Sequence, residues 1–155
     1  MNIARFLNED RIDLDLDGAF DEDNPATYER VTGHMCSLLE TSEQIVNPTK
    51  LRLDLINREK RAPSWLGDGV VLPHVRTLQA RRLVMAVAIS RSGLDLEAPD
   101  DEPVRLVVAL VGPPYDDKQY LQIYKRLADR LRDDGGIATV TDAQAPGEVV
   151  RALSS

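Results

Sequence analysis

The chain has 155 residues, the length of one ordinary domain, and we expect a single domain over 1–155. Its formal net charge of −7 disfavours nucleic acid, because acidic chains repel phosphate backbones, and favours a small basic protein as partner. The single cysteine excludes an internal disulfide and a zinc site built on several thiolates. The N-terminus lacks the pattern of a signal peptide, and the apolar runs are far shorter than the ~20 residues of a membrane span. We therefore expect a cytoplasmic protein with no membrane insertion.

The first elements of the chain are a short helical turn at 3–7 and a strand at 12–16. Apolar residues alternate with aspartates in 12–16, which predicts a half-exposed strand at the edge of a sheet. Two helices follow, and each begins with an Asn-Pro pair that supplies an N-cap residue and a proline in the first turn. The sequence predicts these helices over 25–40 and 48–60.

Three apolar segments come next, each rich in β-branched residues and bounded by Gly, Pro or Asp. They predict strands at 69–72, 83–89 and 104–111, the last two buried on both faces. A helix over 117–133, a brief strand at 137–140 and a helix from Pro146 complete the chain. This order predicts an α/β fold, a three-layer α/β/α sandwich with a mixed sheet.

The chain has two histidines, and their settings differ. His34 lies within the first predicted helix, where it reads as a partly exposed helix residue. His74 follows Pro73 at the end of the predicted strand 69–72, and ligand sites of α/β sheets lie at such strand ends. A neutral imidazole nitrogen is a competent nucleophile toward a phosphoryl group, but a histidine at a strand end is also often structural.

The residues before His74 give it a context. An Arg58-Glu59 pair ends the second helix, and Ser64, Gly67 and Gly69 lead into an apolar strand that ends in Pro-His. This block resembles the signature of phosphotransferase-system (PTS) IIA domains of the fructose, mannitol and nitrogen-regulatory type, the EIIA type-2 domains. The resemblance covers nearly the whole chain and includes the Asp-Glu-Pro-Val segment at 101–104.

The resemblance implies a phosphohistidine carrier. His74 would accept a phosphoryl group from an HPr-like phosphocarrier protein and pass it to an IIB domain or a regulatory target. Arg58 would stabilise the phosphate, with Ser64 as a hydrogen-bond donor. Such transfer depends on positioning and charge stabilisation, so it needs no metal and no cofactor. The alternative interpretation of Arg58 is an arginine that ends a helix and complements the helix dipole. The alternative interpretation of Ser64 is an ordinary turn hydroxyl.

Two positions depart from the family pattern. Tyr120 stands where the family has a second active-site histidine; its hydroxyl can donate a hydrogen bond, but it cannot carry the charge of an imidazolium. The alternative interpretation of Tyr120 is a core aromatic on a helix face. Trp65 lies in an altered turn before the strand, where it reads either as an anchor for a partner or as loop packing.

The leading hypothesis is a phosphoryl carrier of the phosphoenolpyruvate-dependent phosphotransferase system. We expect the domain to stand alone, without fused IIB or membrane domains, which favours a regulatory carrier of the nitrogen branch. The alternative is a regulatory or binding module that kept the fold and lost efficient transfer. A third, weaker possibility is a domain that regulates a transporter, on fold analogy alone.

Overall fold

A six-stranded mixed sheet forms the centre of the protein, in a computed structural model that describes residues 3–154. Its strands run in the order β1-β5-β6-β3-β2, and β4 also pairs with β6. The β5–β6 and β2–β3 pairs are antiparallel, whereas β1–β5, β3–β6 and β4–β6 are parallel. The strands are β1 Ile12–Asp13, β2 Trp65–Gly67, β3 Val70–Val71, β4 His74–Arg76, β5 Val84–Leu94 and β6 Val104–Gly112.

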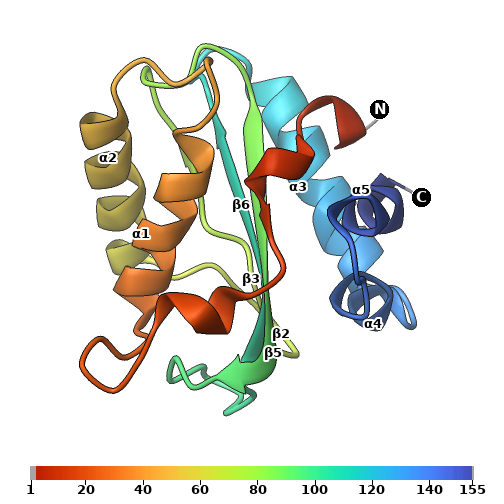
Figure 1. Cartoon of the computed structure of the whole chain (residues 1–155). Helices are drawn as coiled ribbons and strands as arrows, with labels where there is room; N and C mark the ends of the chain where they lie inside the picture. The colour runs from red at the N-terminus through yellow and green to blue at the C-terminus, as the bar shows by residue number, and fades with distance from the viewer. Residues whose placement is uncertain (1–2, 155) are drawn as a thin grey trace.

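Helices cover both faces of the sheet, with α1 and α2 on one side and α3, α4 and α5 on the other (Figure 1). They are α1 Tyr28–Leu39, α2 Pro48–Arg61, α3 Asp117–Arg132, α4 Gly136–Thr141 and α5 Pro146–Ser154. Three short 3-10 helices, η1 Ile3–Arg5, η2 Glu9–Arg11 and η3 Leu16–Ala19, precede them. The predicted three-layer α/β/α sandwich is confirmed.

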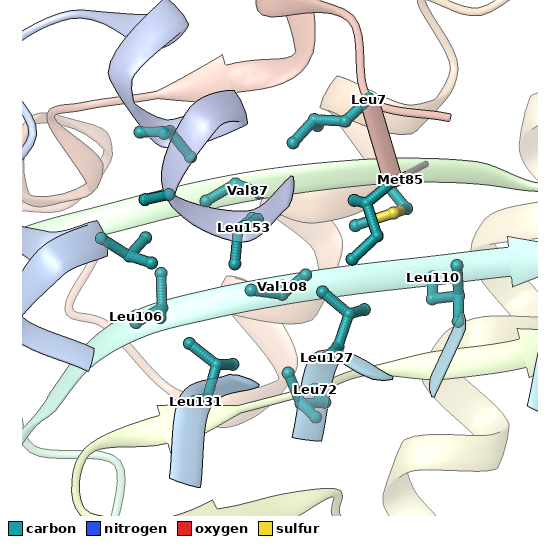
Figure 2. Close-up of a cluster of buried hydrophobic side chains, with 14 of the residues drawn as sticks. Leu7, Leu72, Met85, Val87, Leu106, Val108, Leu110, Leu127, Leu131 and Leu153 are labelled. Carbon is teal, nitrogen blue, oxygen red and sulfur yellow. The ribbon is translucent and has the colours of Figure 1, made fainter. Parts of the chain in front are cut away.

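The central strands β5 and β6 divide their side chains between two hydrophobic cores. Met85 and Val87 point to the α3–α5 side, and Ala86 and Ala88, which alternate with them, point to the α1–α2 side. Figure 2 shows the first of these cores, in which Leu72 lies with side chains of β5, β6, α3 and α5. Burial on both faces explains why these strands are continuously apolar in sequence.

Two predictions near the N-terminus are only partly right. The strand at 12–16 is limited to β1, which does lie at the sheet edge, because Asp15 then caps η3 by accepting a bond from the Gly18 amide. The first helix starts at Tyr28, where the Thr27 side chain accepts from the Arg30 amide. Asn24 instead closes a turn with Asp21. The second helix starts at Pro48 with Asn47 as its cap, as predicted.

The predicted strand at 137–140 is wrong, because these residues form α4. Gly135 has φ 73° and turns the chain into the helix. Threonine has a strand propensity, but the hydroxyls of Thr139 and Thr141 donate to carbonyls four residues earlier and are hydrogen-bonded within the helix. Val140 is fully buried, so packing decides the local structure.

The prediction that His74 ends a strand needs correction. Val70 and Val71 pair with β6, Pro73 interrupts the strand because it has no amide hydrogen, and His74 opens a second short strand beside β6. The Pro73 carbonyl still accepts from the Leu110 amide at 2.9 Å. The chain is therefore bonded to β6 both before and after His74.

In the described part of the chain, no helix is both long and apolar enough to cross a membrane.

Candidate functional site

The imidazole of His74 has a defined proton arrangement. Its Nδ1 atom lies 2.8 Å from the carbonyl oxygen of Leu72, which can only accept a hydrogen bond. Nδ1 therefore carries the proton, and the neutral ring presents its lone pair at Nε2. The Leu72 side chain is 2% exposed, so the carbonyl that orients the ring is anchored in the core.

His74 is half-buried, and this environment keeps the ring neutral. Burial lowers the pKa of His74 below its ordinary value, and the Arg58 charge lowers it further, against the raising effects of the Leu72 hydrogen bond and Glu59. A neutral ring with a free Nε2 is the nucleophilic form of histidine.

Arg58 and Ser64 lie close to His74. The Ser64 hydroxyl lies 3.1 Å from His74 Nδ1 and accepts from Arg58 Nη1 at 3.2 Å. Arg58 also donates to the carbonyl of Ala62, so it closes the end of α2 as well. The Ser64 hydroxyl thus lies between the Arg58 guanidinium and the His74 imidazole.

Glu59, which sequence reasoning did not single out, is the centre of this network. Its side chain is 1% exposed. One carboxylate oxygen accepts from the Tyr28 hydroxyl at 2.6 Å and the Ser64 amide at 3.2 Å. The other accepts from Arg58 at 2.7 Å, the Ser64 hydroxyl at 2.8 Å and the His74 amide at 3.4 Å. A buried carboxylate with this many donors fixes the positions of the groups around His74.

Tyr120 lies beside the site but in the core. Its ring centroid is 6.2 Å from that of His74, and its side chain belongs to the α3–α5 core. Within residues 3–154 its buried hydroxyl has no hydrogen-bond partner. Burial raises the pKa of Tyr120, so the hydroxyl keeps its proton. It is an unused donor next to the imidazole.

Tyr124 is a second residue that sequence reasoning treated only as part of a helix face. One turn further along α3, its ring packs against His74 with centroids 4.6 Å apart. Its spacing of four residues from Tyr120 was the available signal, because such residues share one helix face. The two tyrosines form the wall of the site on the α3 side.

Trp65 lies on β2, and its ring makes a packing contact within the protein. It packs edge-on against Tyr28, with ring centroids 4.9 Å apart. Trp65 therefore supports the residue that donates to Glu59. The residue is partly exposed.

Two charged residues complete the surroundings. The Arg76 guanidinium lies 5.8 Å from the Tyr120 ring centroid and pairs with Asp117 at the start of α3. Among the described residues, no group of three or more His, Cys, Asp and Glu side chains is placed to hold a metal ion.

Comparison with known proteins gives one consistent family. The profile of the phosphoenolpyruvate-dependent sugar phosphotransferase system EIIA 2 family matches residues 6–155. The chain is 26% identical over 133 residues to the fructose-specific EIIA component of Haloferax volcanii, and the match covers 86% of each protein.

Solved structures give the same fold. Nitrogen regulatory protein IIA-Ntr of Neisseria meningitidis has a TM-score of 0.84 at 24% identity, covering 97% of this chain and 98% of that one. Enzyme IIA mannitol of Escherichia coli, in complex with phosphorylated enzyme IIB mannitol, has a TM-score of 0.74 at 19% identity, covering 94% and 95%.

Proposed function

The chain belongs to the phosphoenolpyruvate-dependent sugar phosphotransferase system EIIA 2 family, and on that premise we propose that Nε2 of His74 is its phosphoryl acceptor. The observation that carries the proposal is the bond from Nδ1 to Leu72, which leaves Nε2 as the nucleophilic nitrogen. The likeness of the whole chain to EIIA proteins supports the carrier role.

The transfer balances without an added proton. The Nε2 lone pair of His74 forms a bond to phosphorus while the nitrogen–phosphorus bond of the donor's phosphohistidine breaks. The bonding electron pair returns to the donor's imidazole, which leaves as a neutral ring. The phosphorylated His74 ring then carries a positive charge, which the Leu72 carbonyl and the nearby Glu59 carboxylate stabilise.

We infer that three groups hold the phosphoryl oxygens. Arg58 supplies charge and Ser64 a hydroxyl, and the unpartnered Tyr120 hydroxyl supplies a further donor in the position of the second histidine. These roles rest on geometry and on the family pattern. Trp65 acts indirectly, through Tyr28.

A groove of about 850 Å³ beside β4 suits the approach of a phosphorylated partner. Four cations, Lys50, Lys60, Arg61 and Arg76, line it together with one carboxylate, Asp54. Three of these cations form ion pairs, with Asp54, Glu29 and Asp117. The excess positive charge of this face therefore depends mainly on Arg61, and it favours the negative phosphoryl group of a donor although the chain is acidic. We infer that an HPr-like phosphocarrier in the cytoplasm docks here, and that an IIB domain or a regulatory protein receives the group.

Intact-mass measurement tests the acceptor. The protein is incubated with phosphoenolpyruvate, enzyme I and HPr, with a nitrogen-branch carrier in parallel, and separately with phosphoramidate as a small phosphoryl donor. We expect one acid-labile phosphoryl adduct in the wild type and in His34→Ala, which removes the other histidine, and none in His74→Ala. An adduct that survives in His74→Ala would exclude this residue as the acceptor.

The second candidate, a regulatory module without efficient transfer, is favoured by one observation. The rings of Tyr120 and Tyr124 lie against the imidazole, and Tyr120 stands at the position where the family has a histidine. If phosphoramidate modifies His74 but neither carrier does, the acceptor is competent and the partner differs. If no donor modifies the folded protein, the regulatory module is the better account.

A further inference from the structure

A cavity of about 330 Å³ lies behind the Glu59 network, between α1, α2 and the segment that follows β5. Its walls combine the aromatic rings of Tyr28 and Trp65 with the apolar side chains of Ile56 and Leu96. Its volume is at the lower end of the range for small-molecule sites, so it suits a ligand of about the size of one aromatic ring and a short chain.

The charged groups around this cavity are mainly acidic. Glu29 and Glu97 line it together with Glu59, against one cation, Lys60. Lys60 is already paired with Glu29 at 2.6 Å, and Arg58 offsets the charge of Glu59 from the other side. Within residues 3–154 the Glu97 carboxylate forms no ion pair, so it is the charge left over for a ligand.

We propose that this cavity binds a small organic ammonium ion, with Glu97 as its counter-ion and the Tyr28–Trp65 pair as its aromatic wall. Aromatic faces attract cations through their ring quadrupoles, and an adjacent carboxylate adds a direct charge interaction. The apolar side chains accommodate the hydrocarbon part of the ligand. An anionic ligand is disfavoured here, whereas the basic groove beside β4 has the opposite preference.

The cavity shares residues with the site around His74. The hydroxyl of Tyr28 donates to Glu59, and Glu59 in turn holds Ser64 and the His74 amide. A ligand against Tyr28 therefore touches the network that positions the imidazole. The binding proposal itself does not depend on phosphoryl transfer, and its test does not use it.

Trp65 supplies a direct readout because it is the only tryptophan of the chain. Its fluorescence is followed while phenethylammonium is titrated, with the uncharged 2-phenylethanol and the anionic 3-phenylpropionate as probes of similar size. We expect saturable binding of the ammonium and weaker binding of the other two. Glu97→Gln should weaken ammonium binding by about two- to fivefold, the contribution of one partly exposed charge pair.

Asp100→Asn is the matched control, because Asp100 lines a neighbouring cavity of about 240 Å³ that shares only Trp65 with the proposed site. It should leave ammonium binding unchanged. The proposal is overturned if the fluorescence change is not saturable or the three probes bind alike. It is also overturned if Asp100→Asn weakens binding as much as Glu97→Gln does.

Discussion

Two tyrosine hydroxyls near the site differ in their hydrogen bonding. Tyr28 donates to Glu59 at 2.6 Å and accepts from the Ser64 amide at 2.8 Å. The Tyr120 hydroxyl has no partner within residues 3–154. A satisfied buried hydroxyl stabilises the fold, whereas an unpartnered one has lost its hydration without compensation. From this contrast we expect the Tyr28 hydroxyl to stabilise the fold and the Tyr120 hydroxyl to bind a ligand.

Removing each hydroxyl separates the two roles. Tyr28→Phe should lower the free energy of unfolding by about 1.5–3 kcal/mol, since it removes a bond to a buried charge. Tyr120→Phe should leave stability unchanged or raise it by up to about 1 kcal/mol, and shorten the lifetime of the phosphorylated protein. Urea denaturation measures the first quantity and timed mass spectra the second. Equal losses of stability in the two variants would contradict this assignment.

The half-buried imidazole of His74 makes the free energy of unfolding depend on pH in one direction. Because the pKa of His74 lies below its ordinary 6.5, the folded protein binds this proton less readily than the unfolded chain. The stabilisation is complete above pH 6.5 and is lost as the pH falls from 6.5 through the pKa of the folded state. An NMR titration of the ring should show the low midpoint, and His74→Gln should remove this part of the pH dependence. A midpoint at or above 6.5 would refute the expectation.

Sequence could propose His74, Arg58 and Ser64 as candidate site residues because they lie within one short, recognisable block. It missed Glu59 as a centre and Tyr28 as its donor, since their contact joins residues 31 positions apart. It placed Tyr120 and Tyr124 on one helix face, but not against the imidazole. Such contacts depend on how α1 and α3 pack on the sheet.

At the level of elements, the turn between β2 and β3 determines where β3, the strand before His74, begins. Gly67, Asp68 and Gly69 all have positive φ, at 95°, 55° and 82°. The Gly69 carbonyl accepts from the amides of Arg105 and Leu106, which ties the turn to β6. A Cβ at Gly69 would lie 2.6 Å from the carbonyl oxygen of Pro103. Glycine is required at this position both for its backbone conformation and for close approach.

Gly69→Ala should therefore lower the free energy of unfolding by at least about 2 kcal/mol, from left-handed strain plus the backbone clash. Gly135→Ala is the matched control: φ is also positive, at 73°, but nothing lies within 4 Å of the added atom. It should cost about 1 kcal/mol. Thermal or urea unfolding compares the two, and equal losses would show that the contact with Pro103 does not matter.

Elements with strong local signals were predictable, and those decided by packing were not. Asn47-Pro48 starts α2 as expected, and the long apolar runs form β5 and β6. The residues at 137–140 form a helix because α4 packs Val140 into the core, against their strand propensity. The division of 69–76 into two short strands depends on pairing with β6, which is distant in sequence.

For the whole molecule, net charge and local charge point in opposite directions. A net charge of −7 suggests a basic partner, yet the groove beside β4 is lined mainly by cations. Local potential governs how a phosphorylated donor approaches, so the groove should decide the rate of transfer. The acidic remainder of the surface lies outside the groove and should have no direct part in this step.

Arg61→Glu tests this division. It should slow phosphoryl transfer from a carrier protein by roughly three- to tenfold at low salt and reduce the salt dependence of the rate. Arg126→Glu changes an exposed charge on α3 outside the groove and should have little effect. Modification by phosphoramidate should be the same in both variants. Equal slowing by the two substitutions would indicate that only net charge matters.

The central claim is that Nε2 of His74 receives the phosphoryl group. The most direct test is NMR of the ¹⁵N-labelled, phosphorylated protein, in which a phosphorus–nitrogen coupling identifies the modified ring atom. We expect the coupling at Nε2 of His74, with Nδ1 still bearing its proton against Leu72. A coupling at Nδ1, or on any residue other than His74, would contradict the account.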